Sequence, residues 1–350
     1  MKTPRSAHPT QTNGLQVPSG SDDAAAGRRM TRRAAVLALG SSAVVALGGC
    51  GLRLGKGSPA SLPTASPAET ARDGLARQAA LTVASGVTLV RDCGVPVDNS
   101  GVSNLVGPRL IRCGRHVARP KRYMRDLPID VDDQAELPGL LASMATRSDG
   151  WVKIVGDWID RSAGAQADLM PLWDPSVLID AVAAVHEAGA RIAVHAFSHR
   201  VIDSLIEAGV DDIEHGTGID KDQASEIAAR GIAVTPTLRQ VELFADFAEQ
   251  AGAKYPVYAA TMRAMFEGRR EHFQMLIDAG VLLLQGTDSG GYQDHGSIAG
   301  ELALWSRWGA SAALIIDAST WVTQRYLGRP GLVEAGDADF IVLDEDPRVD

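Results

Sequence analysis

The chain has 350 residues, of which 45% are hydrophobic and 22% charged, and its formal net charge is −9. This composition is typical of a globular protein and excludes a disordered or fibrous chain. The acidic excess argues against a basic surface, so we expect no nucleic-acid partner. Its three cysteines, Cys50, Cys93 and Cys113, form no C-x-x-C pair, which argues against a disulfide framework and a structural zinc knuckle.

The first seventy residues have the pattern of an export signal between polar segments. Residues 1–30 are rich in Ser, Gly and Pro, as in a disordered tail. In 31–50, paired arginines precede an apolar run that closes with "LGGC". This layout is typical of twin-arginine export, and it resembles a bacterial lipoprotein processing site that would place a lipid on Cys50. We therefore expect an exported lipoprotein attached to the membrane through Cys50. The alternative is that residues 34–47 form a buried strand or helix of a cytoplasmic protein.

Residues 51–70 read as a Ser/Pro-rich linker, and a β–α alternation follows. Short β-branched runs alternate with Ala-rich helical patterns such as 175–190 and 221–231. The runs predict strands at 87–92, 109–113, 151–156, 191–197, 211–216, 232–238 and 281–288.

This alternation predicts an α/β fold, a (β/α)8 TIM-type barrel over residues 71–328. Only seven strands are counted, and no strand precedes the first helical pattern, so the first strand of the barrel is missing. A doubly wound sheet is the alternative, weakened because no G-x-G-x-x-G follows the first strand.

Four polar residues fall within or at the ends of the predicted strands. Lys153 lies inside "WVKIVG", while His195, His215 and Asp288 close "RIAVHAF", "DDIEHG" and "VLLLQGTD". Each alone has an ordinary reading as a core histidine, a helix cap or half of a buried ion pair. The carboxyl ends of barrel strands meet at one face, however, so four such residues there indicate a site. Imidazole and carboxylate suit zinc and similar divalent ions.

Other residues near the strand ends are candidates for supporting roles. Glycines at 216, 286 and 290 are expected to leave room for a metal and a substrate. His295, after the last strand, is expected to touch substrate or support Asp288. His116 lies in the basic loop "CGRHVARPKRYM", which is suited to a substrate carboxylate or, as the alternative, simply solvated.

The sequence resembles the amidohydrolase superfamily, in particular its imidazolonepropionase-like and Xaa-Pro-dipeptidase-like branch. The matching segments occur in the family's order over residues 71–347 and include "GVTLVRDCG", "WVKIVGDW", "ARIAVHAFS", "AGVDDIEHGTG", "LLQGTDSGG" and "GLVEAGDADFIVLDEDP".

The resemblance implies a barrel with one or two divalent ions, zinc above all. It implies His195, His215 and Asp288 as ligands, and Lys153 as the lysine that is carbamylated in binuclear members. The implied chemistry is hydrolysis of a C–N bond in a small-molecule substrate, of non-peptide or dipeptide type. Metal-activated water attacks, and Asp288 shuttles the proton.

The sequence departs from the family at both ends. The first strand of the family ends in His-x-His, which this chain lacks. Of the family's small β-sandwich, only one strand in 329–350 remains. The alternative function is therefore a catalytically impaired remnant or a small-ligand-binding exported lipoprotein. A barrel without its first strand has unpaired edges, so we expect aggregation unless residues 34–47 replace that strand.

Overall fold

The structure is a computed structural model that describes residues 42–45, 67–96, 106–334, 336 and 339–348, with only the backbone described in 42–45 and 67–73. Its strands are β1 Ser42–Val45, β2 Leu89–Asp92, β3 Arg109–Arg112, β4 Val117–Ala118, β5 Ile129–Asp130, β6 Trp151–Val155, β7 Asp157–Ile159, β8 Leu169–Pro171, β9 Arg191–Ala196, β10 Asp212–His215, β11 Ala233–Thr235 and β12 Leu282–Leu283.

The α-helices are α1 Pro67–Ala84, α2 Leu137–Ala145, α3 Pro175–Glu187, α4 His199–Ala208, α5 Lys221–Arg230, α6 Leu238–Val241, α7 Phe244–Ala251, α8 Pro256–Glu267, α9 Arg269–Asp278, α10 Ile298–Arg307, α11 Ala312–Ser319 and α12 Trp321–Tyr326, with short 3-10 helices at η2 Gln134–Glu136, η3 Arg161–Gln166 and η4 Gly252–Lys254. Across the described residues, none of these helices has the length and apolar character needed to cross a membrane.

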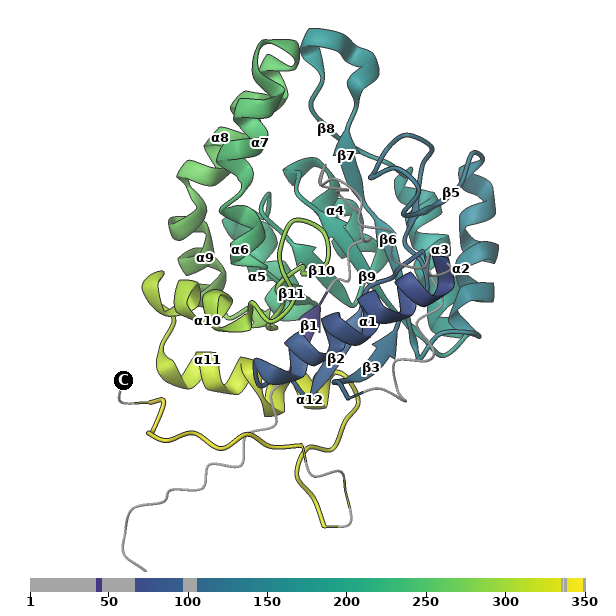
Figure 1. Cartoon of the computed structure of the whole chain (residues 1–350). Coiled ribbons are helices and arrows are strands. Elements are labelled where there is room, and N and C mark those ends of the chain that lie inside the picture. Colours follow the sequence, from purple (N-terminus) through teal and green to yellow (C-terminus); the bar gives the residue numbers. More distant parts are fainter. Residues whose placement is uncertain (1–41, 46–66, 97–105, 335, 337–338, 349–350) are drawn as a thin grey trace, which may run out of the picture. The chain divides into compact units, whose positions relative to one another are not determined.

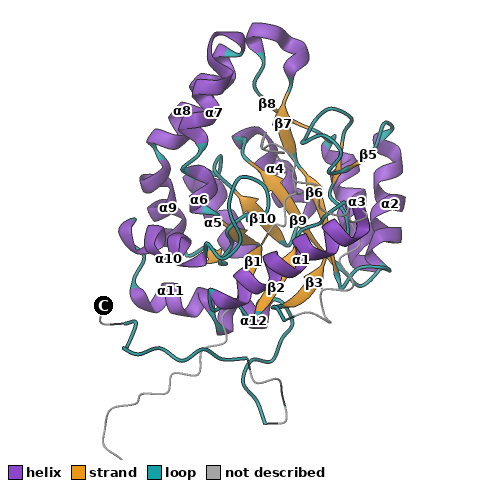
Figure 2. Cartoon of the chain, in the orientation of Figure 1, coloured by secondary structure: helices purple, strands orange, loops and turns teal. Residues whose placement is uncertain are grey.

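Two parallel sheets form the centre of the fold (Figure 1). One has the order β1-β2-β3, and the other has the order β12-β11-β10-β9-β6-β4-β5. In the larger sheet, β9, β10, β11 and β12 are neighbours in chain order and are joined by helices, as in repeated β–α units. The antiparallel pair β7-β8 stands apart and holds η3 between its strands. Strands gather centrally and most of the helices lie outside them (Figure 2).

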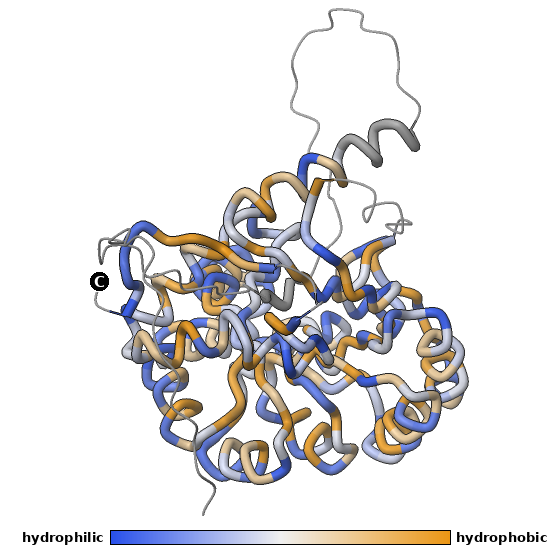
Figure 3. Tube along the Cα trace, turned by 90° about the horizontal axis from the view of Figure 1, so that it is seen from below, coloured by the Kyte–Doolittle hydropathy of each residue, from blue (hydrophilic) through white to orange (hydrophobic). Residues whose placement is uncertain are grey.

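One face of the larger sheet packs against the outer helices. Val152, Ile154, Val194 and Ile213 join the buried side chains of α3 and α4 in one hydrophobic cluster. Hydrophobic and hydrophilic positions alternate along the helices at the outside of the fold (Figure 3), so each helix can bury one side and expose the other.

The opposite face of the strands is polar and buried, because successive side chains of a strand point to opposite faces. The ammonium of Lys153 pairs with Glu214, and Arg91 pairs with Asp212 and Glu214. Cys93 donates its thiol proton to Glu214 Oε1 at 2.8 Å. An ion that is buried without a partner costs several kcal/mol, so these charges depend on one another. Lys153 is thus a paired ion of the interior.

The seven predicted strands all occur, as β2, β3, β6, β9, β10, β11 and β12, which confirms the mostly parallel α/β sheet. Within the signal-like segment, Ser42–Val45 forms β1 and pairs in parallel with β2. Among the described residues, no pairing of strands joins the two sheets. The described part of 329–350 contains no named strand.

Candidate functional site

Three of the four predicted ligands lie on the neighbouring strands β6, β9 and β10, and the fourth follows β12, which β11 separates from β10. Lys153 is on β6, His195 on β9 and His215 at the end of β10, and all three are buried. Asp288 follows β12 and is half-buried. His195 and Asp288 line one pocket, and the ring of His215 lies against that of His195.

The backbone is strained at this place. In the described residues, five non-glycine residues have positive φ, and three of them are His215 (67°), Thr237 (45°) and Asp288 (51°). A side chain in this left-handed region costs about 1 kcal/mol or more and persists only where the surroundings impose it. Such outliers cluster at functional sites, and here they coincide with two predicted ligands.

The two histidines form a close pair with different partners. Their ring centroids are 4.7 Å apart. His215 Nδ1 lies 2.6 Å from Thr237 Oγ1, which fixes the ring and leaves Nε2 as the nitrogen for a ligand. Both ring nitrogens of His195 are buried without a hydrogen-bond partner in the described chain. His195 Nε2 also lies 3.9 Å from Asp157 Oδ1, which is too far for a hydrogen bond. A buried imidazole without hydrogen bonds is costly unless something binds it.

Electrostatics keep both rings neutral. Burial, and then the charge of Lys153, lower the pKa of His215 well below its ordinary value of 6.5. For His195, burial comes first, followed by His215 and Lys153. Neutral imidazole is the form that binds metals. Burial raises the pKa of Asp288 to about 7, against the opposing charge of Lys153.

The chemical types of these donor atoms suit a metal ion, but the distances between them do not. Two neutral imidazoles and a carboxylate are a set that zinc accepts. Among the residues that the structure describes, however, no three His, Cys, Asp or Glu side chains stand close enough together to hold an ion.

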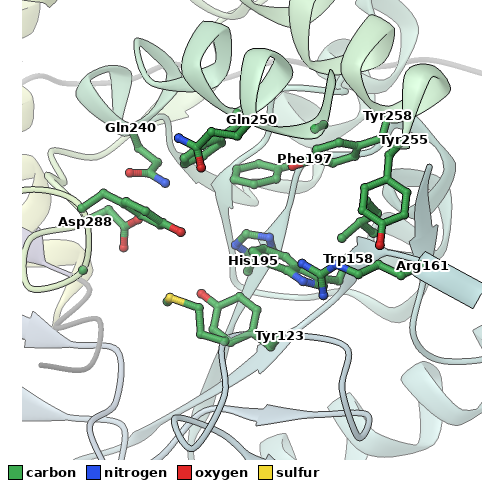
Figure 4. Close-up of a pocket in the computed structure, with 16 residues that line it drawn as sticks. Tyr123, Trp158, Arg161, His195, Phe197, Gln240, Gln250, Tyr255, Tyr258 and Asp288 are labelled. Carbon is green, nitrogen blue, oxygen red and sulfur yellow. The ribbon is translucent and has the colours of Figure 1, made fainter. Parts of the chain in front are cut away.

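A pocket of about 210 Å³ opens beside His195 and Asp288. Of the sixteen residues drawn around it in Figure 4, seven are aromatic: Tyr123, Trp158, Phe197, Phe247, Tyr255, Tyr258 and Tyr292. Asp288 and Arg161 lie on opposite sides of the pocket with His195 between them (Figure 4). The pocket therefore surrounds the candidate ligands His195 and Asp288 with aromatic side chains.

His116 and His295 lie elsewhere than at the pocket wall. His116 is buried and stacks on Tyr123 with ring centroids 5.6 Å apart, and burial lowers its pKa to about 3. His295 is half-buried, and its Nδ1 lies 3.3 Å from Thr82 Oγ1 on α1. Neither is among the described residues that line the pocket. Cys50 lies outside the described residues.

The structure requires glycines after β10 for a different reason from the one expected. A Cβ on Gly216 would lie 2.7 Å from the side chain of Ile219, and one on Gly218 would lie 2.1 Å from the backbone of His199. These glycines let the loop pack against its own fold. The expectation that Gly216 leaves room for a metal and a substrate is wrong, because protein atoms fill that space.

Sequence reasoning missed three features of the site. It did not find Thr237, which holds His215, or Glu214, which pairs with Lys153. It also missed Arg161 and most of the aromatic residues, since they come from the β7-β8 excursion and from α7 and α8.

In the basic loop around His116, Arg115 binds the protein's own backbone, donating to carbonyls such as Leu127 O at 3.1 Å.

The fold and the site define a class, that of α/β enzymes whose polar groups lie at the carboxyl ends of parallel strands. The amidohydrolase family matches residues 51–350. An uncharacterized protein of Mycobacterium tuberculosis is 42% identical over 301 residues, which are 85% of this chain and 77% of that relative. One of Mycobacterium bovis has the same identity and coverage. The chain belongs to the amidohydrolase family and is a hydrolase of carbon–nitrogen bonds by class.

Solved structures agree in fold. A Xaa-Pro dipeptidase with bound methionine in its active site has a TM-score of 0.69 and 21% identity, over 89% of this chain and 82% of that one. The ochratoxinase of A. niger has a TM-score of 0.70 and 20% identity, over 89% of this chain and 78% of that one. At this identity the likeness concerns the fold alone.

Proposed function

We propose that the chain is a metal-dependent amidohydrolase that cleaves an amide-type C–N bond of a small molecule beside His195 and Asp288. The observation that carries this proposal is the close pair of neutral histidines, of which His195 lines the same pocket as Asp288 and is buried without a hydrogen-bond partner among the described residues. The family supports the class of reaction.

The groups that would hold a divalent ion are His195, His215 and Asp288, which would have to move closer together than they are in the described structure, joined by Lys153 if it is carbamylated. Zinc suits this set best, as one ion or two. When bound, a divalent ion supplies polarisation of the carbonyl oxygen and a water nucleophile at neutral pH. Lys153 must leave Glu214 before it can be carbamylated, because its ammonium is now the partner of that carboxylate.

The chain's own residues divide the remaining work. Asp288 takes a proton from the attacking water and returns it to the leaving nitrogen. Thr237 keeps His215 in one ring orientation. The aromatic walls exclude water and position the substrate.

We further propose that the fold is a (β/α)8 barrel and that, in the unprocessed chain, β1 stands in for the missing first strand. Its parallel pairing with β2 supports this proposal. The segment 329–350 is proposed as the remnant of a β-sandwich.

Export with lipid attachment at Cys50 remains our proposal for localisation, with a cytoplasmic protein as the alternative. Processing before Cys50 would remove residues 42–45, and with them β1, so a processed molecule cannot keep the β1–β2 pairing. The intact mass of the chain purified from its natural host separates the two: a processed, lipid-bearing chain supports export, and a chain that keeps β1 opposes it.

A second candidate, a ligand-binding protein without catalysis, is favoured by the absence of His-x-His from the sequence. Elemental mass spectrometry after reconstitution with zinc and bicarbonate tests the two. At least one ion per chain, lost in His215→Ala, together with turnover of an amide substrate, supports the hydrolase. A folded protein that binds no metal supports the second candidate.

A further inference from the structure

The pocket is much more aromatic than the chain around it. Seven of its sixteen lining residues are aromatic, whereas aromatic residues make up 5% of the sequence. The rings also contact one another: Trp158 stacks on Phe197 at 6.4 Å, and Phe247 meets Tyr292 edge to face at 5.1 Å. Aromatic walls of this kind bind a flat apolar group through its faces and edges.

Arg161 adds one positive charge to this aromatic pocket. It is the first residue of η3, and it is exposed. The described residues offer it no ion-pair partner. The carboxylate beside it in sequence, Asp160, is engaged elsewhere, with Ser162 and with Arg122 at 3.4 Å.

The local backbone fixes this position. Asp160 accepts a hydrogen bond from the backbone N–H of Ser162 at 3.0 Å and so caps the start of η3. The antiparallel pairing of β7 with β8 holds both ends of the excursion. Arg161 is therefore presented to the pocket on an anchored segment.

The arrangement along the pocket has an order. Figure 4 shows Asp288 on one side, His195 in the middle and Arg161 on the far side. A guanidinium without a partner is suited to a carboxylate, which it can bind through two parallel hydrogen bonds. A substrate cleaved near His195 would thus bring its carboxylate to Arg161 and its ring to the aromatic walls.

We infer that the ligand of this pocket is an aromatic carboxylate, so that the substrate class is an amide bearing both an aromatic group and a carboxylate bound by Arg161. That this ligand is a substrate rests on the proposed hydrolase function, whereas the binding of such a ligand does not.

Binding of three probes without an amide bond tests the inference. The probes are 4-phenylbutanoate, which has ring and charge, 4-phenylbutan-1-ol, which has the ring alone, and hexanoate, which has the charge alone. Affinities are measured by isothermal titration calorimetry on the full chain with EDTA present, so that no metal can bind the carboxylate. We expect 4-phenylbutanoate to bind about tenfold more tightly than either other probe.

Variants assign the effect to its residues. Arg161→Gln should remove the preference for the acid over the alcohol and leave the affinity of the alcohol unchanged within about twofold. Arg307→Gln, which removes a charge from an exposed residue of α10 away from the pocket, is the matched control and should keep the preference. Tyr292→Ala, at a residue that is 59% exposed, should weaken 4-phenylbutanoate and leave hexanoate unchanged.

The inference is overturned if 4-phenylbutanoate does not bind, if acid and alcohol bind equally, or if Arg161→Gln keeps the preference. These results are separable from the proposed function. Binding as expected, with no amide hydrolysis by the zinc-loaded chain, would reject the hydrolase and keep the ligand class. Hydrolysis of neutral aliphatic amides, with no preference for the acid over the alcohol in binding, would support the hydrolase and reject the ligand class.

Discussion

Replacing Glu301 by glutamine should destabilise the protein, and more so at pH 5 than at pH 8. Glu301 is a fully buried residue of α10. It accepts hydrogen bonds from the backbone N–H groups of Leu238 and Arg239, at 2.7 and 2.8 Å, and from Trp305 Nε1 at 3.0 Å. It thereby holds the start of α6, next to Thr237.

The structure gives the size of the effect. Glutamine can keep one oxygen for Leu238 and Trp305, but its amide nitrogen then faces the N–H of Arg239. One buried donor left without an acceptor costs about 1 to 3 kcal/mol of the free energy of unfolding. This is the expected cost at pH 8.

The pH dependence follows from the pKa of Glu301. Burial raises this pKa from 4.5 to about 7, despite the hydrogen bonds that oppose the shift. The folded state therefore binds the proton more tightly than the unfolded state does. This stabilisation is complete below about pH 4.5 and is lost as the pH rises through about 7. Between pH 5 and pH 8 the loss is about 2 to 3 kcal/mol. Glutamine does not titrate, so the cost of the substitution is larger at pH 5 by that amount.

Urea unfolding followed by tryptophan fluorescence at the two pH values measures both quantities. Other titrating groups cancel in the difference between wild type and variant. Glu271→Gln, at an exposed position on α9, is the control and should change stability by less than about 0.5 kcal/mol at either pH. An equal cost of Glu301→Gln at pH 5 and pH 8 would refute the reasoning, because it would mean that burial does not raise the pKa.

Three further predictions concern the site and the sheet. Thr237→Val should lower zinc affinity about 10- to 100-fold, measured by competition with a chelating dye, because His215 loses the hydroxyl that orients it; unchanged affinity would show that this contact has no such role. His195→Ala should reduce bound zinc per chain in elemental analysis, whereas His199→Ala, at an exposed position on α4, should not; equal losses would count against the site. Deleting residues 1–49 removes β1 and exposes an edge of β2, so the monomer fraction in size-exclusion chromatography should fall, while deleting 1–35 should leave it unchanged. Monomeric, stable protein after the longer deletion would contradict the role of β1.

The sequence by itself determined the sheet and the residues at its strand ends. Buried parallel strands read as short apolar runs, and the repeat of run and helix carries their order. For that reason β6, β9 and β10 occur where the pattern predicted them, with Lys153, His195 and His215 in place. The expected parallel α/β sheet is confirmed, whereas the ligand roles of these residues stay predictions.

Only the tertiary structure decided what surrounds those residues. The bond from Thr237 to His215 and the pair of Lys153 with Glu214 join positions that are 22 and 61 residues apart, and no periodicity encodes such contacts. The pocket likewise gathers Trp158 and Arg161 from the β7-β8 excursion and Tyr258 from α8. Local pattern fixes which face of an element is buried, but the partners across that face depend on how separate elements pack. The chemistry at the strand ends could therefore be read along the chain, while the shape and charge of the pocket came from the packing of segments that carry no such pattern.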